Sequence, residues 1–150
     1  MAAAFKRALI ASDHGGFMLK GGIKRRLEGK GFEYEDLGTD SEEACDYPDY
    51  ALKVAKRVAI EQGAAGILVC GTGIGMCITA NKVKGIRAAL CWNEETAKLA
   101  REHNNANVLC LGGRVIETAE AEKIVDVFLE TEFSREERHA RRVEKMDALP

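Results

Sequence analysis

The sequence predicts an α/β protein in which a parallel β-sheet lies between two layers of helices. Two observations favour this fold class. Apolar segments of strand length alternate with longer amphipathic segments five times along the chain, and the connections between them are short. The apolar segments in the middle of the chain are uninterrupted, as expected of strands that are buried on both faces. Helices on both faces of such a sheet give a three-layer α/β/α sandwich.

The first predicted unit is a strand at Arg7–Ser12 followed by a helix at Phe17–Lys30. The strand segment, RALIAS, is a short apolar run that ends in polar residues. The helix segment has its apolar side chains at helix-like spacing. Gly29 and Gly31 are suited to the end of this helix, because the residue just past a helix often takes a left-handed conformation.

The second unit begins with Phe32–Leu37, where apolar and acidic residues alternate, and this pattern predicts a strand with one exposed face. A polar loop, Gly38–Tyr47, follows it. Pro48 is suited to the first turn of a helix that we expect to run to about Gln62, where Gly63 ends it.

The third and fourth units contain the most apolar strands. Gly66–Cys70 is a continuous apolar run, and a glycine-rich turn leads from it into a helix that ends near Lys82. Ile86–Cys91 is a second run that we expect to be buried. The helix Glu94–Glu102 follows it, with Asn93 as its N-cap.

The last unit consists of a strand at Asn107–Leu111 and an amphipathic helix at Thr118–Leu129. Beyond it, Ser134–Lys145 is highly charged and has helical spacing. The sequence contains no internal repeat and no interdomain linker, so we expect a single α/β domain over residues 1–150. Within it, residues 133–150 form a tail of their own, because their polarity leaves little to bury against the main core.

Composition limits the classes of function. Apolar residues make up 46% of the 150 residues and charged residues 31%, which is ordinary for a globular protein and unlike a disordered chain. The 22 basic and 24 acidic residues give a net charge of −2, without the basic excess that is typical of nucleic-acid binding. No apolar stretch approaches the ~20 residues of a membrane span. We therefore expect neither a nucleic acid nor a membrane as partner.

Five cysteines occur at irregular spacing, with no CxxC pair and no zinc-like spacing to histidine. They are Cys45, Cys70, Cys77, Cys91 and Cys110. Most lie in or near apolar segments, which is typical of free thiols in a reducing compartment. The N-terminus shows no signal-peptide pattern, so we expect a cytoplasmic location.

Cys70 and the five residues after it, CGTGIG, form the segment most informative about chemistry. Its glycines allow a sharp turn that points several backbone N–H groups into one space, and the next helix adds its positive end. Such a cradle is suited to a phosphate or to an oxyanion formed during a reaction. A thiol at its edge is favoured as a thiolate, so Cys70 is a candidate base or nucleophile. The alternative is that Cys70 only packs the end of the strand.

Other polar residues lie near the edge where open α/β sheets bind ligands, beyond the carboxyl ends of the strands. Asp13 and His14 follow the first strand, and Arg114 follows the fifth. His103 and Asn104 end a helix and must reach over to the same edge. Three of them have a structural alternative: Asp13 as a helix cap beside a surface His14, and His103 as a helix-end residue favoured by the helix dipole.

The charged tail contains a basic group that is suited to an anion. Arg138 and Arg142 are four residues apart and share a helical face, where their like charges repel unless an anion lies between them. The alternative is a solvated face whose charge is balanced by Glu136, Glu137 and Glu144.

Six segments, in chain order, resemble the type B ribose-5-phosphate isomerases, a family that includes the galactose-6-phosphate isomerase subunits. The segments are SDHGG (12–16), DYPDYA (46–51), CGTGIGMCITANK (70–82), GIRAAL (85–90), EHNNANVLCLGGR (102–114) and RHARR (138–142). They extend over nearly the whole chain, and six motifs in register are far more specific than any one of them.

The resemblance implies a Rossmann-like α/β/α fold and an aldose–ketose isomerase that needs no metal and no cofactor. The family interconverts ribose 5-phosphate and ribulose 5-phosphate, a step of the pentose phosphate pathway. The family forms homodimers, sometimes tetramers, whose active sites lie between subunits. The tail of each subunit is therefore expected to reach its partner.

The resemblance also implies roles for residues in the reaction. Cys70 is the expected base, which moves a proton between C2 and C1 of the sugar. His103 and Asp13 are expected to assist opening of the furanose ring. The groups expected to hold the enediolate oxygens are Thr72 and the backbone N–H groups around Gly71, Gly73 and Gly75.

Further residues are expected to bind the substrate. Tyr47 and Asn104 are expected to contact the sugar. The phosphate is expected to be held by His14, Arg114 and, from the partner subunit, Arg138 and Arg142.

The resemblance leaves alternatives open. Some family members use this cysteine as the base, whereas others use a glutamate later in the loop. Met76 at that position cannot take a proton, which assigns the chain to the cysteine branch. The sugar is not fixed, and allose 6-phosphate or galactose 6-phosphate are alternatives. So are a subunit that needs another chain for activity and a nucleotide-binding module using residues 71–75, although the GxGxG spacing and the missing Lys-Ser/Thr ending count against the module.

Overall fold

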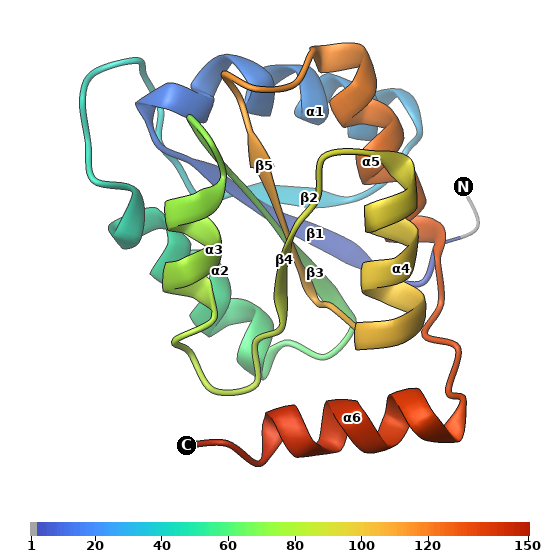
Figure 1. Cartoon of the computed structure of the whole chain (residues 1–150). Helices are drawn as coiled ribbons and strands as arrows, with labels where there is room; N and C mark the ends of the chain where they lie inside the picture. Colours follow the sequence, from blue (N-terminus) through green and yellow to red (C-terminus); the bar gives the residue numbers. More distant parts are fainter. Residues whose placement is uncertain (1–2) are drawn as a thin grey trace.

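The computed structural model describes residues 3–150 and has the predicted α/β architecture (Figure 1). Five strands form one sheet: β1 (Arg7–Ser12), β2 (Tyr34–Asp36), β3 (Ala64–Cys70), β4 (Ala88–Leu90) and β5 (Val108–Gly112). The helices are the 3-10 helix η1 (His14–Gly16) and α1 (Phe17–Gly29), α2 (Tyr47–Ile60), α3 (Ile74–Ala80), α4 (Glu94–Asn104), α5 (Thr118–Glu130) and α6 (Glu137–Asp147). None of the helices within the described range is long and apolar enough to cross a bilayer.

The sheet order is β2-β1-β3-β5-β4, and every pair of neighbours is parallel. The central strand, β3, is buried over all seven of its residues, as its unbroken apolar sequence predicts. Because the strands are parallel, the loops that follow β1, β3 and β5 leave from one edge of the sheet. These three strands are neighbours, so their loops lie side by side.

The helices cover both faces of the sheet, as the sequence predicts (Figure 1). On one face, α1, α4 and α5 form an apolar core with the strands, in which Ile23 and Phe128 are fully buried. On the other face, α2 and α3 pack together, and Val54 and Met76 are fully buried. The loops at the strand ends are therefore held by a core on each side.

Several predicted helix ends are confirmed. Gly31 has a left-handed conformation, with φ of 65°, just after the end of α1. Pro48 lies in the first turn of α2. The side chain of Asn93 accepts a hydrogen bond from the Thr96 N–H at 2.8 Å and so caps α4.

Two expectations about elements are wrong in detail. The run Ile86–Cys91 is only partly a strand, and the three residues of β4 are half-buried, because β4 is an edge strand with one neighbour. The tail helix begins at Glu137 and not at Ser134, which precedes it in an irregular segment.

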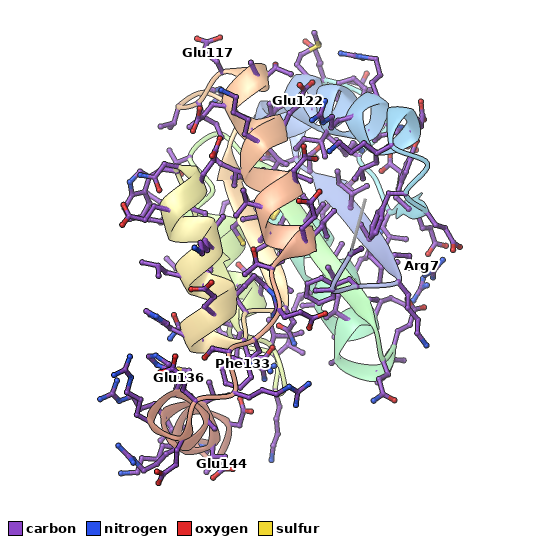
Figure 2. The ribbon with its side chains drawn as sticks, turned by 90° about the vertical axis from the view of Figure 1, so that its right-hand side faces the viewer. Arg7, Glu117, Glu122, Phe133, Glu136 and Glu144 are labelled. Carbon is purple, nitrogen blue, oxygen red and sulfur yellow. The ribbon has the colours of Figure 1, made fainter. Side chains whose placement is uncertain are left out.

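The tail helix α6 extends along the amino edge of the sheet, opposite to the three loops described above. Figure 2 shows it nearly end-on beside the end of α4, with the segment containing Phe133 leading into it. Two contacts attach it to the rest of the chain: Asp147 forms an ion pair with Arg87 at 3.1 Å, and His139 is buried against α4. Arg87 lies just before β4, which places the end of α6 at that edge as well.

Candidate active site

The loops after β1, β3 and β5 interlock through their backbones. The N–H of Gly113 donates to the carbonyl of Cys70 at 2.8 Å, and the N–H of Arg114 donates to the carbonyl of Gly71 at 2.9 Å. A Cβ atom on Gly113 would lie 2.8 Å from the carbonyl oxygen of Gly15 and 3.2 Å from the Cα of Gly16. Only glycine permits so close an approach of two backbones. The three loops therefore form one rigid rim, which carries most of the residues that the sequence predicts for the site.

The glycine loop forms a tight turn around the Cys70 sulfur. The N–H of Gly73 donates to Sγ of Cys70 at 3.1 Å, which fixes the direction of the thiol. Gly73 has φ of 80°, a left-handed conformation that side chains disfavour, and it begins α3. The exposed Thr72 side chain accepts a hydrogen bond from the Ile74 N–H at 3.2 Å. The loop thus presents a thiol, a hydroxyl and successive backbone N–H groups at one place.

Arg114 brings a positive charge to this rim. A Cβ atom on Gly15 would lie 3.3 Å from Cζ of Arg114, 3.1 Å from the backbone nitrogen of Gly71 and 3.3 Å from Oδ1 of Asp13. A Cβ on Gly71 would lie 3.2 Å from a terminal guanidinium nitrogen of the same arginine. The guanidinium therefore lies over both glycine turns, where it is suited to an anion.

Asp13 and His14 also lie at the rim, in defined orientations. Asp13 is 6% exposed, and its Oδ1 accepts a hydrogen bond from the Gly16 N–H at 3.1 Å, so it does cap η1. Nδ1 of His14 accepts a hydrogen bond from the backbone N–H of Cys45 at 3.2 Å. In the neutral ring this places the proton on Nε2, which is then a donor. The polar loop before α2 thus orients one histidine of the site.

Tyr47 joins the same group from the start of α2. Its ring lies directly against Gly75, where a Cβ atom would collide with the ring and hydroxyl of the tyrosine. The residue is 40% exposed, and its hydroxyl lies beside the glycine loop. The structure therefore brings together eight of the predicted site residues from one chain: Asp13, His14, Tyr47, Cys70, Gly71, Thr72, Gly75 and Arg114, with Gly73 in the same loop.

The remaining predicted residues form a second cluster. His103 and Asn104 end α4, and the imidazole of His103 stacks on that of His139 in α6, with ring centroids 4.1 Å apart. Arg138 and Arg142 are exposed on the same helix. This basic cluster consists of His103, Asn104, Arg138, His139 and Arg142.

The expectation that His103 and Asn104 reach the Cys70 rim is wrong for a single chain. Helix α4 starts at the carboxyl edge and runs back, so that it ends at the amino edge, just before β5 begins. The seven residues of β3 span on the order of 20 Å between the two edges. One sugar phosphate cannot touch both groups of one chain.

The structural alternative for the tail, a solvated face with balanced charge, is present in part. Arg138 forms an ion pair with Glu136 at 3.3 Å, and Arg141 forms one with Glu137 at 3.7 Å. Both pairs are solvent-exposed, so they contribute little to stability.

The other cysteines differ in environment. Hydrogen bonding with the Cys110 thiol lowers the pKa of Cys77 to about 7, and that of Cys110 is raised correspondingly. Burial raises the pKa of Cys91 to about 12. Cys91 and Cys110 are buried packing residues, whereas Cys77 is half-buried on α3.

Sequence reasoning placed His139 beside Arg138 and Arg142 in the charged tail, but it gave the residue no role and did not predict that it is buried. Its signal is the spacing to Val143: the two are four residues apart, both are buried, and together they form the inner face of a helix that is otherwise charged. Among residues 3–150, no group of three or more His, Cys, Asp or Glu side chains is arranged to hold a metal ion.

The chain is similar to known proteins over nearly its whole length. The family model for ribose/galactose isomerase matches residues 8–146. A probable ribose-5-phosphate isomerase B of Mycoplasma genitalium is 50% identical over 139 residues, which cover 91% of each chain. The crystal structure of a ribose 5-phosphate isomerase from Thermotoga maritima is 53% identical, with a TM-score of 0.92 over 95% of this chain and 98% of that one. The Mycoplasma genitalium enzyme with bound ribulose-5-phosphate is 48% identical, with a TM-score of 0.88 over 94% and 93%.

Proposed function

Because this chain belongs to the ribose/galactose isomerase family, we propose that it is a ribose-5-phosphate isomerase of type B. It interconverts ribose 5-phosphate and ribulose 5-phosphate through an enediolate. The observation that carries this proposal is the Cys70 thiol, fixed by a backbone N–H at the mouth of a glycine loop, in a fold shared with an enzyme that binds ribulose-5-phosphate.

Cys70 is the base in this reaction. It removes the proton from C2 of the open-chain aldose and returns a proton to C1, while the carbonyl shifts from C1 to C2. A C–H bond beside a carbonyl is only weakly acidic, so the enediolate oxygens need hydrogen-bond donors. Thr72 and the loop N–H groups other than those of Gly73 and Ile74, which bond within the loop, supply them. Each preorganised donor contributes on the order of 3–4 kcal/mol. Met76 is fully buried and has no ionisable group, which supports the assignment of Cys70 as the base.

Ring opening precedes this proton transfer. The C1–O4 bond breaks, the ring oxygen gains a proton and the anomeric hydroxyl loses one. His103 donates the first proton and Asp13 assists removal of the second. In one chain these residues lie at opposite edges of the sheet, so the His103 that serves a given Cys70 belongs to a second copy.

The substrate phosphate and hydroxyls are divided between the copies in the same way. His14 and Arg114 bind the phosphate from the rim, and Arg138 and Arg142 of a second copy bind it from the other side. Tyr47 of the first copy and Asn104 of the second contact the sugar. Because these phosphate contacts are remote from C1 and C2, their binding energy positions the reacting carbons.

A homodimer with two shared sites is the smallest assembly that completes this arrangement. Large apolar side chains exposed near the rim support it: Ile74 and Ile78 on α3, and Trp92 before α4, are 51%, 58% and 59% exposed. The five free cysteines support a reducing location such as the cytoplasm.

The test is isomerisation by the purified chain, without added metal and with a chelator present. Ribose 5-phosphate, allose 6-phosphate and galactose 6-phosphate are the substrates. Turnover of ribose 5-phosphate that is lost in Cys70→Ala and retained in Cys91→Ala, a buried thiol in the packing core, is the expected result. A folded chain that turns over none of the three would overturn the proposal. Titration calorimetry with ATP and NAD then tests the nucleotide-binding alternative, for which saturable micromolar binding is required.

A further inference from the structure

Two histidines from different helices stack face to face at the amino edge of the sheet. The rings of His103, in the last turn of α4, and His139, in the first half of α6, have centroids 4.1 Å apart and planes inclined by 14°. The backbone holds this pair: the N–H of Ser134 donates to the carbonyl of Glu102 at 3.2 Å, which attaches the segment before α6 to the end of α4. The contact is therefore part of how the tail joins the domain.

The two rings differ in exposure and in hydrogen bonding. The side chain of His139 is only 7% exposed, whereas His103 is half-buried. Nε of Arg138 donates to Nε2 of His139 at 3.3 Å. A guanidinium can only donate, so Nε2 of His139 is an acceptor, and the ring is neutral with its proton on Nδ1.

The charged groups around His139 favour this neutral form. Burial, His103 and Arg138 lower the pKa of His139, and Arg142 on the next turn of α6 adds to the effect. Glu136, whose carboxylate lies 4.0 Å from Nε2 just before α6, acts in the opposite direction and is outweighed. Two cationic rings stacked at this distance would also repel each other, so at most one ring of the pair carries a charge.

We propose that His139 is a positioning residue for the ring-opening step: its neutral ring holds the His103 imidazole in one orientation and leaves His103 as the member of the pair that exchanges a proton with the sugar. The inference rests on the proposed function, because it acts through the role given there to His103. A neutral aromatic face is a suitable neighbour for an imidazole that gains and loses charge during turnover.

The experiment compares His139→Ala, which removes the stacked ring, with His139→Phe, which keeps an aromatic ring that cannot titrate. We expect His139→Ala to lower kcat for ribose 5-phosphate about tenfold with KM changed less than about threefold, since general acid–base catalysis is lost while phosphate binding is kept. We expect His139→Phe to recover most of this loss. The pH profile of kcat should keep its shape in His139→Phe, because the exchanging group is His103.

A double-variant comparison separates positioning from a structural effect. In a His103→Ala background, His139→Ala should change the residual rate less than about twofold, because its partner is already absent. Val143→Ala, a buried position one turn further along α6, is the matched control for loosened packing and should reduce activity equally in both backgrounds. The NMR signals of the His103 ring should lose their ring-current shift in His139→Ala and keep it in His139→Phe.

The possible failures are distinguishable. An active parent with equally active His139→Ala, or equal losses in the two backgrounds, overturns the positioning role and leaves the proposed function intact. A parent without isomerase activity overturns the proposed function and this inference with it.

Discussion

The placement of the site residues at two edges of the sheet makes mixed subunits a decisive test. Consider chains with Cys70→Ala, which damages the rim, and chains with Arg142→Ala, which damages the basic cluster. Each is expected to be inactive alone, because every shared site of the proposed homodimer would then lack one group. In a mixed dimer, one site combines the intact Cys70 of one chain with the intact Arg142 of the other, and the second site carries both defects.

The expected recovery follows from counting these sites. Random exchange of equal amounts gives mixed dimers in about half of the population, each with one intact site out of two, and so about a quarter of the parent activity. If the site were complete within one chain, every chain in the mixture would carry a defect and no activity would return. The two arrangements therefore differ by a large and easily measured signal.

The assay is isomerisation of ribose 5-phosphate after the two variants are exchanged in mild denaturant and refolded together, with exchange verified by native mass spectrometry of chains that differ in mass. A third variant, His103→Ala, should also restore activity when mixed with Cys70→Ala, since the two substituted residues lie at opposite edges of the sheet. Arg114→Ala is the matched negative control, because it belongs to the same rim as Cys70. Absence of recovery despite proven exchange, or rescue by Arg114→Ala, would refute the two-edge arrangement.

Three further perturbations have defined outcomes. Gly113→Ala places a Cβ atom 2.8 Å from the Gly15 carbonyl oxygen. It should lower the free energy of unfolding by about 2 kcal/mol in a denaturant titration and reduce isomerase activity in a kinetic assay. An unchanged stability and activity would contradict the interlocked rim. Since Cys77 has a pKa of about 7 through its hydrogen bond with Cys110, its alkylation by iodoacetamide should be half-maximal near pH 7, whereas Cys110 stays unmodified in peptide mass spectrometry; a midpoint above 8 would argue against that hydrogen bond. Burial alone would raise the pKa of Asp36, but hydrogen bonds from two lysines bring it below its ordinary value of 3.8. The stabilisation of the fold by ionised Asp36 is therefore present at neutral pH and lost as pH falls below about 4. Asp36→Asn should lower the free energy of unfolding by about 3 kcal/mol at pH 7 and by much less at pH 3, as measured by thermal unfolding.

Much of the fold was predictable because local patterns and global packing agree. The unbroken apolar run that ends at Cys70 identifies a central strand. Asn93 has the side chain that caps a helix start, and Gly31 has the backbone freedom that a helix end requires. The edge strand β4 was the exception. An apolar run indicates burial, but it does not tell how many neighbours a strand has, and β4 has only one.

The geometry of the candidate site was predictable only in part. Residues that directly follow a strand, such as Asp13 and Arg114, lie where a parallel sheet requires. His103 directly precedes β5 in the sequence, yet it belongs to the opposite edge, because a helix that returns across the sheet reverses the direction of the chain. The stacking of His139 depends on the angle at which the tail meets α4, for which the sequence has no local signal.

The crossing of the three loops at Gly15, Gly71 and Gly113 also determines which amino-acid substitutions the protein can accept during evolution. Apart from the Thr72 hydroxyl, the donors of the cradle are peptide groups, which no replacement of a side chain can delete. Substitutions in the neighbouring loops leave those donors in place, whereas gaining a single methyl group at a crossing point displaces a whole loop. Variation in sugar preference is therefore expected to arise from Tyr47 and from the basic cluster, while the three glycine positions and Cys70 stay unchanged.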